Sequence, residues 1–438
     1  MDAITIGLSL MGMLAFLLVS GTWIFVSLLL IAGLGLSIFL GYPMDRIGSI
    51  GTRVILTSAQ KWELAAIPLF VFMGELIYRS DISDRMFRGL LPVVGRFPGS
   101  LLHTNVLGSI VFGAVSGSSS ATTAMVGKIT LPNLEERGFD RKTALGALAA
   151  SGGLGLLIPP SIMLIVYGVM VEQSIIRLFA AGVVPGLLIG ALFSLYIALR
   201  HGARAKRAAG GSAIELDRDQ LSFGNLWQLG PIAILFTIVL GAIYSGIATP
   251  SESAAIGVLA TAIVLVALRQ FNLRKSYDAI IATVLTSSMI CIILIVASFL
   301  SSAMGFLHLP QIMAESAGGL IERPYVLIAI LALFYLLMGC FLDGISIAVM
   351  TLPIVFPMIS QAGFDPIWFG VFLVITVEAG LITPPLGFNL FIVSGMSGEP
   401  IGKVARAALP FFFLMLLFMI LLICMPGIAL WLPDVMQR

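Results

Sequence analysis

The chain has 438 residues, of which 59% are hydrophobic and 11% are charged, and its mean hydropathy is +1.09. Soluble domains carry about 25% charged residues, so the composition excludes an ordinary water-soluble protein. The formal net charge of +2 is too small to indicate a nucleic-acid partner. The composition therefore predicts a polytopic membrane protein.

Long apolar runs recur from end to end, and in lipid such runs without strand alternation should be helices, because every backbone polar group must be satisfied within the segment. No positively charged segment precedes the first run, so we expect a retained helix and not a signal peptide. About ten runs are long enough to cross the membrane. They lie near residues 4–20, 23–40, 64–79, 141–171, 178–199, 226–246, 253–268, 278–300, 366–396 and 407–432.

Two apolar regions, at about 99–133 and 324–362, are each broken in the middle by small or polar residues. An arm of about 12 helical residues rises about 18 Å, well short of the roughly 30 Å hydrocarbon core. We therefore expect two re-entrant helical hairpins in addition to the crossings. The predicted fold class is an all-α integral membrane protein.

The two halves of the chain share residues at a constant offset of 225, which indicates an internal repeat. The matching pairs are Pro132 with Pro357, Gly138-Phe139-Asp140 with Gly363-Phe364-Asp365, Gly155-Leu156 with Gly380-Leu381, and Pro159-Pro160 with Pro384-Pro385. We expect a first repeat at 1–224, with a broken helix at about 141–171 and a cytoplasmic linker at 200–224. The second repeat is expected at 225–438, with its broken helix at about 366–396.

Each predicted half has five crossings and one hairpin, and this odd number of crossings makes the repeat inverted. If the 200–224 loop lies inside, 17 of the 24 Lys and Arg residues fall in inside segments, six fall outside, and Lys128 lies in a hairpin arm. Positive residues favour the cytoplasmic side. The distribution therefore predicts that both termini lie outside.

The paired prolines are the first candidates for binding chemistry. A proline leaves the carbonyl four residues earlier without its helical partner, and here these are the Gly155, Leu156, Gly380 and Leu381 carbonyls. A free carbonyl at membrane depth needs a partner, such as a desolvated cation. The alternative is a pair of structural kinks satisfied by neighbouring hydroxyls or water.

The first hairpin tip, residues 117–123, contains five hydroxyl side chains at the start of a short helix. Hydroxyl and carbonyl oxygens suit sodium, and the unpaired N–H groups of a helix N-terminus suit a carboxylate. Serine clusters in membrane proteins also allow close helix packing, so that interpretation stays open.

The second tip contains Asp343, an acid deep in an apolar region. Such residues are costly in a membrane and are candidates for function. Asp343 could bind a cation, contact a polar substrate or only cap the following helix. Glu75 and Glu378 are weaker candidates, because either could pair with a basic residue, and Lys128 could extend to the inner surface or take part in binding.

Motifs for other functions are missing from the sequence. No phosphate-binding G-x-x-x-x-G-K-[ST] pattern is present, so ATP is not expected as the energy source, and no nucleophile elbow lies near the three histidines. We therefore expect a protein that is not an enzyme.

At these motifs the chain resembles the large membrane (M, DctM-type) subunit of the tripartite ATP-independent periplasmic (TRAP) transporters. The resemblance runs through nearly the whole chain. It is carried by Ile67-Pro68-Leu69-Phe70, Met73-Gly74-Glu75, Ser116-Gly117-Ser118-Ser119, Ile158-Pro159-Pro160-Ser161, Leu178-Phe179, Pro185-Gly186, Phe341-Leu342-Asp343, Gly380-Leu381-Ile382-Thr383-Pro384-Pro385, Gly387 and Asn389.

The resemblance implies sodium-driven uptake of organic acids by an elevator-type transport domain that bears both hairpins. It also implies a small four-helix membrane subunit (Q type) and a periplasmic substrate-binding protein (P type) as partners. No four-helix segment precedes the first run, so a separate Q-type subunit is expected. The location implied is the bacterial inner membrane.

The family pattern, carried onto this sequence, implies two sodium sites and one substrate site. The first sodium site would use Ser118, Ser119, Gly153, Gly155 and Leu156, and the second would use Gly339, Asp343, Gly380 and Thr383. Substrate would lie between the tips, near Ser120, Thr122, Ser161, Asp343 and Asn389.

The expected function is therefore sodium-coupled symport of a C4-dicarboxylate, sugar acid or sialic acid. Two alternatives stay open. One is a standalone sodium/carboxylate or sodium/proton carrier, and the other is an ion channel lined by the same broken helices.

Overall fold

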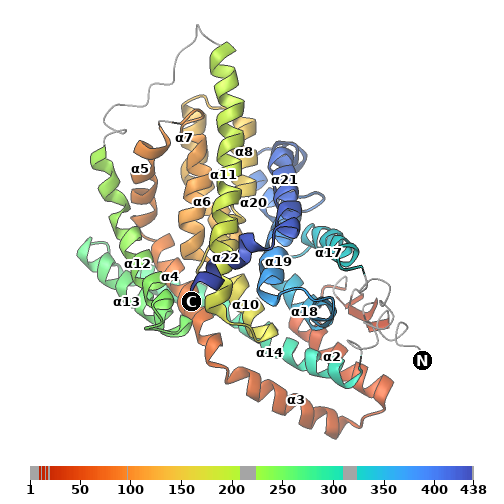
Figure 1. Ribbon diagram of the computed structural model, residues 1–438. Coiled ribbons are helices and arrows are strands. Elements are labelled where there is room, and N and C mark those ends of the chain that lie inside the picture. The colour runs from red at the N-terminus through yellow and green to blue at the C-terminus, as the bar shows by residue number, and fades with distance from the viewer. Residues whose placement is uncertain are drawn as a thin grey trace.

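The computed structural model describes residues 9–10, 12–14, 16–17, 20–95, 97–207, 223–308 and 323–436, with backbone alone at 202–207 and 223. Much of the crossing expected at 4–20 and most of the linker expected at 200–224 therefore lie outside the described residues. Every regular element within the described ranges is a helix, which confirms the predicted all-α class (Figure 1).

The first half of the chain forms a series of helices that ends in a long, apolar one. They are α2 (Ile24–Leu40), α3 (Met44–Ala59), η1 (Trp62–Ala65), α4 (Ala66–Tyr78), α5 (Ile82–Val94), α6 (Leu102–Ser116), α7 (Ser119–Glu136), α8 (Arg141–Ser151), α9 (Leu154–Leu157), α10 (Ile162–Val171) and α11 (Ile175–Arg207).

The second half follows the same order. Its helices are η2 (Phe223–Leu229), α12 (Gly230–Tyr244), α13 (Pro250–Ala267), α14 (Leu273–Phe306), α17 (Pro324–Gly339), α18 (Gly344–Gln361), α19 (Pro366–Leu381), α20 (Phe388–Ser397), α21 (Ile401–Cys424) and α22 (Gly427–Met436).

Helix bounds recur at the offset that relates the sequence motifs. Both ends of α7 differ from those of α18 by 225 residues, and so do the starts of α8 and α19. One pair differs: α3 and the segment at 62–78 are bent by 57°, whereas α14 is one helix of 34 residues. The break lies at residues 60–61, between α3 and η1, where the equivalent residues at the offset of 225 lie within α14.

Among the described residues, six helices are long and apolar enough to cross a membrane, or eight if each of two bent pairs forms one span. The sequence predicted about ten crossings. Three of the ten are not counted: the run at 4–20 lies largely outside the described residues, and the runs at 23–40 and 366–396 form shorter helices, the second of them interrupted at its prolines. Helix α18 reaches 18 residues, which is longer than the hairpin arm expected there.

The two halves pack against each other. Helix α8 contacts α21, and α4 contacts α13 and α14. Two buried hydrogen bonds tie α19 into this core: the Tyr167 hydroxyl donates to the Pro366 carbonyl over 2.6 Å, and Trp368 Nε1 donates to the Leu422 carbonyl over 3.1 Å. Helix α19 is buried along most of its length, whereas α20 buries only Asn389, Leu390 and Val393.

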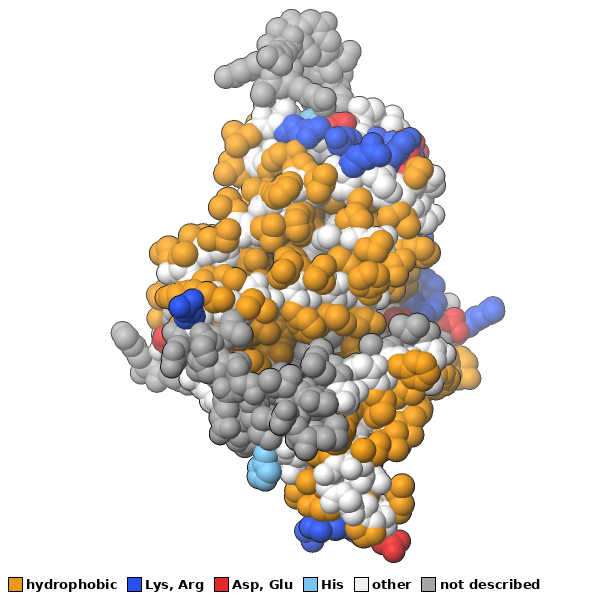
Figure 2. All heavy atoms as spheres, turned by 90° about the vertical axis from the view of Figure 1, so that its right-hand side faces the viewer, with side chains coloured by type: hydrophobic (Ala, Val, Ile, Leu, Met, Phe, Trp, Pro, Cys, Tyr) orange, Lys and Arg blue, Asp and Glu red, His pale blue; other side chains and the backbone are white. Residues whose placement is uncertain are grey.

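The outer surface is strongly apolar, as expected for a protein surrounded by lipid. Figure 2 shows hydrophobic side chains over most of one face, with Lys and Arg gathered near one end. Large apolar side chains such as Leu285 and Phe413 are 70% and 61% exposed. A soluble monomer rarely presents so large an apolar patch, so this surface agrees with the membrane prediction.

Candidate functional site

The two hairpins expected from the sequence are helix pairs. Helices α6 and α7 meet at Gly117 and Ser118, and α17 and α18 are joined by residues 340–343. Gly117 has φ +59°, the left-handed conformation that glycine adopts without strain. Each second arm starts at a polar N-cap, Ser118 or Asp343, and these two caps are 225 residues apart.

Several hydroxyls of the first tip have neighbouring side chains as partners. The Ser118 side chain accepts a hydrogen bond from the Ala121 N–H over 3.4 Å and lies 3.2 Å from the Ser120 hydroxyl. The Ser116 and Thr122 hydroxyls lie 2.8 Å apart. A hydroxyl oxygen has two lone pairs, so these contacts leave acceptor capacity at the tip.

Asp343 caps the second hairpin arm. Its carboxylate accepts a hydrogen bond from the Ser346 N–H over 3.1 Å and another from the Ser346 hydroxyl. The residue is partly buried. The capping role considered from the sequence is therefore present, and because a carboxylate has about four lone-pair sites, capping does not use them all.

Both broken helices are interrupted at their paired prolines, and the Pro159–Pro160 and Pro384–Pro385 peptide bonds are both cis. The Ser161 hydroxyl donates to the Leu156 carbonyl, so a side chain satisfies one of the carbonyls expected to be free. In the second half, Thr383 donates its hydroxyl to the Ala379 carbonyl over 2.8 Å and its N–H to the Gly380 carbonyl over 2.9 Å.

Glycines let each hairpin touch the broken helix of its own half. A Cβ on Gly155 would lie 2.7 Å from Gly113 Cα, and one on Gly380 would lie 2.7 Å from Gly339 Cα. Non-bonded carbons pack at about 3.5–4.0 Å. Only glycine permits these approaches, which explains why the predicted ligands Gly155, Gly339 and Gly380 lack side chains.

A second set of contacts crosses between the halves. The Ser119 hydroxyl, at the first tip, lies 3.0 Å from Glu378 Oε2 on α19. It also lies 2.9 Å from Asn389 Nδ2 and 3.3 Å from Asn389 Oδ1 on α20. The exposed fractions are 5% for Ser119, 3% for Glu378 and 0% for Asn389. This buried cluster joins residues that are 259 and 270 positions apart.

The predicted substrate group is only partly brought together. Thr122, Ser161 and Asn389 are each 0% exposed, whereas Ser120 and Asp343 keep some exposure. Asn389 contacts the first tip through Ser119, which links it to the neighbourhood of Ser120. The assignment of these side chains to substrate stays a prediction.

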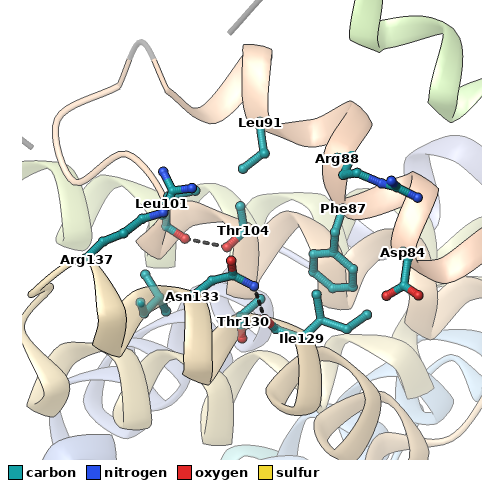
Figure 3. A pocket seen from close by; sticks show the side chains of 11 residues that line it. Asp84, Phe87, Arg88, Leu91, Leu101, Thr104, Ile129, Thr130, Asn133 and Arg137 are labelled. Atoms are coloured by element: carbon teal, nitrogen blue, oxygen red, sulfur yellow. Dashed lines mark hydrogen bonds between the residues drawn. The ribbon is translucent and has the colours of Figure 1, made fainter. Parts of the chain in front are cut away.

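A pocket of about 420 Å³ lies away from the tips, between α5, the start of α6 and the later turns of α7 (Figure 3). Arg88, Asn133 and Arg137 give it a polar, basic rim, and Phe87 with Ile129 forms an apolar wall. None of the predicted site residues lines this pocket. Its position does not support a role as the predicted substrate site.

The structure distinguishes the three weaker candidates, Glu75, Lys128 and Glu378, by their partners and exposure. Arg79 Nε donates to the Glu75 carboxylate over 3.0 Å. This ion pair balances the charge of Glu75 and gives the residue a structural role. Lys128 is exposed and lies ten residues after Ser118. It lines another pocket together with Glu135, which agrees with a side chain that extends to the surface. Glu378 has no ion-pair partner among the residues that the structure describes. The feature of the sequence that pointed to Glu378 is an acid within an apolar helix.

Comparison with known proteins identifies the family. The family model described as "Tripartite ATP-independent periplasmic transporter, DctM component" matches residues 11–428. The C4-dicarboxylate TRAP transporter large permease protein DctM of Pseudomonas aeruginosa is 34% identical over 402 residues, covering 91% of this chain and 92% of that protein. The sialic acid TRAP transporter large permease protein SiaM of Vibrio cholerae is 28% identical over 390 residues, covering 88% and 90%.

The fold is also similar to a solved structure. The crystal structure of the YdaH transporter of Alcanivorax borkumensis matches with a TM-score of 0.52 and 16% identity, covering 90% of each chain. At this identity the likeness concerns the fold alone. It agrees with the all-α transporter architecture described above.

Proposed function

Because the chain belongs to the DctM component family of tripartite ATP-independent periplasmic transporters, we propose that it couples sodium entry to uptake of an organic acid anion. The substrate class is a C4-dicarboxylate, a sugar acid or a sialic acid, as the names of two relatives suggest. The observation that carries the proposal is the pair of hairpin tips, capped by Ser118 and Asp343, each beside a broken helix.

Two sodium sites would lie where hairpins and broken helices touch. The first would use the Ser118 and Ser119 hydroxyls with backbone carbonyls of the first broken helix, and the second would use the Asp343 carboxylate with carbonyls and the Thr383 hydroxyl. The complete sets are Ser118, Ser119, Gly153, Gly155 and Leu156 for the first site, and Gly339, Asp343, Gly380 and Thr383 for the second. The close glycine contacts support this placement, because they bring carbonyls of both elements together.

The substrate would bind between the tips, in reach of Ser120, Thr122, Ser161, Asp343 and Asn389. Helices α7 and α18 both start there, and the unpaired N–H groups of their first turns suit a carboxylate. Each sodium ion that enters gains about 2.3 kcal/mol per 100 mV of membrane potential. Coupling to sodium would therefore offset the electrostatic cost of moving an anion inward against the membrane potential.

Alternating access would come from movement of an elevator-like domain that contains both hairpins and both broken helices. We assign residues 1–224 and 225–438 to two inverted repeats, with 200–224 as a cytoplasmic linker. The recurrence of helix bounds at an offset of 225 supports this division. The protein would lie in the bacterial inner membrane with both termini in the periplasm.

The transporter would require two further proteins. A small four-helix membrane subunit of the Q type would pack beside this chain, and a P-type periplasmic protein would deliver the substrate. Names of the relatives support this, since they describe large permease components of TRAP transporters. The binding protein would determine much of the substrate selectivity.

Uptake into proteoliposomes tests the proposal. Vesicles would contain this chain together with its Q-type and P-type partner proteins. Radiolabelled C4-dicarboxylate and sialic acid would be supplied with and without an inward sodium gradient. We expect uptake only with all three proteins and the gradient, and a large loss with Asp343→Asn. The matched control Glu75→Gln should keep uptake, because Glu75 pairs with Arg79 within one helix and belongs to neither predicted sodium site.

Other outcomes would replace the proposal. Equal uptake without a sodium gradient would contradict the coupling. Uptake by this chain alone would identify a standalone carrier, and flux that does not saturate would identify a channel.

A further inference from the structure

Glu378 is a buried acid with no positive partner. It lies on α19 and is 3% exposed. Its Oε2 accepts a hydrogen bond from Ser119 over 3.0 Å, while its Oε1 is buried without any hydrogen-bond partner among the described residues. No Lys, Arg or His side chain in the described ranges lies within 4.0 Å of it. This differs from Glu75, which bonds to Arg79.

An isolated carboxylate in such a place is costly. Transfer of an unpaired charge into a low-dielectric interior costs several kcal/mol even after relaxation, so buried charges are paired or bind metal ions. The lack of a hydrogen-bond partner for Glu378 Oε1 adds to this cost. At this position the carboxyl group either holds a proton or pairs with a cation, and the described protein side chains supply no cation.

Three neutral or anionic oxygen donors converge at this point. Ser119 Oγ lies 3.0 Å from Glu378 Oε2 and 3.3 Å from Asn389 Oδ1, and it also accepts a hydrogen bond from Asn389 Nδ2 over 2.9 Å. All three side chains are buried, and they come from α7, α19 and α20. Carboxylate, hydroxyl and amide oxygens form the hard ligand set that binds metal cations such as Ca²⁺ and Mg²⁺ and equally suits Na⁺.

The position of Glu378 in the repeat explains the space for its carboxylate. Its equivalent at the offset of 225 is Gly153. These two residues touch: a Cβ on Gly153 would collide with Glu378 Oε2 and would lie 2.8 Å from Cδ. One half therefore contributes an acid and the other a glycine that makes room for it. The result is a single carboxylate between the two broken helices.

We propose that Glu378 is the anionic ligand of the first sodium site, with Ser119 Oγ and Asn389 Oδ1 beside it. This inference rests on the proposed function, and it moves Asn389 from the substrate group to the cation site. The first site then includes side chains from both halves of the chain. Each sodium site contains one carboxylate, Glu378 in the first and Asp343 in the second, so each bound ion is neutralised locally.

The consequence for coupling concerns the first hairpin. Ser119 lies at the hairpin tip, whereas Glu378 and Asn389 lie on the broken helix of the other half. Sodium bound between them holds this tip against α19 and α20. Occupancy of the first site therefore stabilises the contact between the halves and also fixes the neighbouring residue Ser120 at the substrate site.

The test measures sodium binding by the purified full-length chain in detergent. Thermal melting and equilibrium binding of ²²Na⁺ are followed as NaCl replaces choline chloride at constant ionic strength. The wild-type chain should be stabilised by sodium. Glu378→Gln keeps the size and the hydrogen bond to Ser119 but removes the charge, and we expect its half-saturating sodium concentration to rise at least tenfold. Glu75→Gln is the matched control and should behave as wild type.

Each result has a definite meaning. A sodium titration of Glu378→Gln that matches wild type, with the same amount of bound ²²Na⁺, would overturn the assignment of Glu378 while leaving sodium coupling intact. A wild-type chain that binds no sodium would overturn the proposed coupling as well. If Glu378→Gln does not fold, Asn389→Ala provides the second variant, because only this inference places Asn389 at the cation site: a raised half-saturating sodium concentration supports the assignment, and an unchanged one refutes it.

Discussion

Substitution of Gly380 by alanine tests the close contact between the second hairpin and its broken helix. The new Cβ would lie 2.7 Å from Gly339 Cα and 2.9 Å from the Leu336 carbonyl oxygen. Carbon atoms pack at about 3.5–4.0 Å, so the helices must separate by roughly 1 Å. Both neighbouring atoms belong to the backbone, and no side-chain rotation can relieve the clash.

The expected magnitude follows from two opposing terms. Overpacking of a tight interior costs about 1–3 kcal/mol. Replacement of an interior helical glycine by alanine gains about 1 kcal/mol in helix propensity. The difference between these terms predicts that Gly380→Ala destabilises the protein by up to about 2 kcal/mol, and that it also weakens sodium binding if the Gly380 carbonyl is a ligand.

Thermal melting of the purified chain in detergent provides the measurement. The control is Gly241→Ala in α12, where a Cβ would meet no atom within 4 Å, so the propensity gain should appear alone. Gly241→Ala should melt at or above the wild-type temperature, and Gly380→Ala below it. If Gly380→Ala were as stable as the control, the close helix approach would not exist, and the reasoning about glycine at the site would be refuted.

Three further substitutions test other contacts by the same melting assay. Ser161→Ala should lower the unfolding free energy by about 1 kcal/mol, because it removes an N-cap and the hydrogen bond to the Leu156 carbonyl; no change would mean that water replaces both. Tyr335→Phe should lower the unfolding free energy by about 0.5–1.5 kcal/mol, because it removes the buried 3.1 Å hydrogen bond to Thr351. No change would mean that the Thr351 hydroxyl has another partner. Glu75→Gln should change stability by less than about 1 kcal/mol, since its ion pair is partly exposed, and a larger loss would contradict a surface role.

Much of the architecture was accessible from the sequence because it depends on local patterns. Hydropathy alone predicted the helical membrane class, and the offset of 225 matched the bounds of α7 and α18. The N-caps Ser118 and Asp343 also lie where the tips were expected. The number of crossings was less accessible, because helix length and bending depend on packing: the 57° bend after α3 has no counterpart in α14.

The partners of the candidate residues divide in the same way. The bond from Arg79 to Glu75 spans four residues of one helix, so its spacing could have been recognised in the sequence. The contact of Ser119 with Glu378 spans 259 residues, and no local pattern specifies it. Sequence periodicity determines which residues face inward on a helix. Which inward faces meet is decided by the packing of the two halves, because such contacts depend on how all the helices together fill the interior.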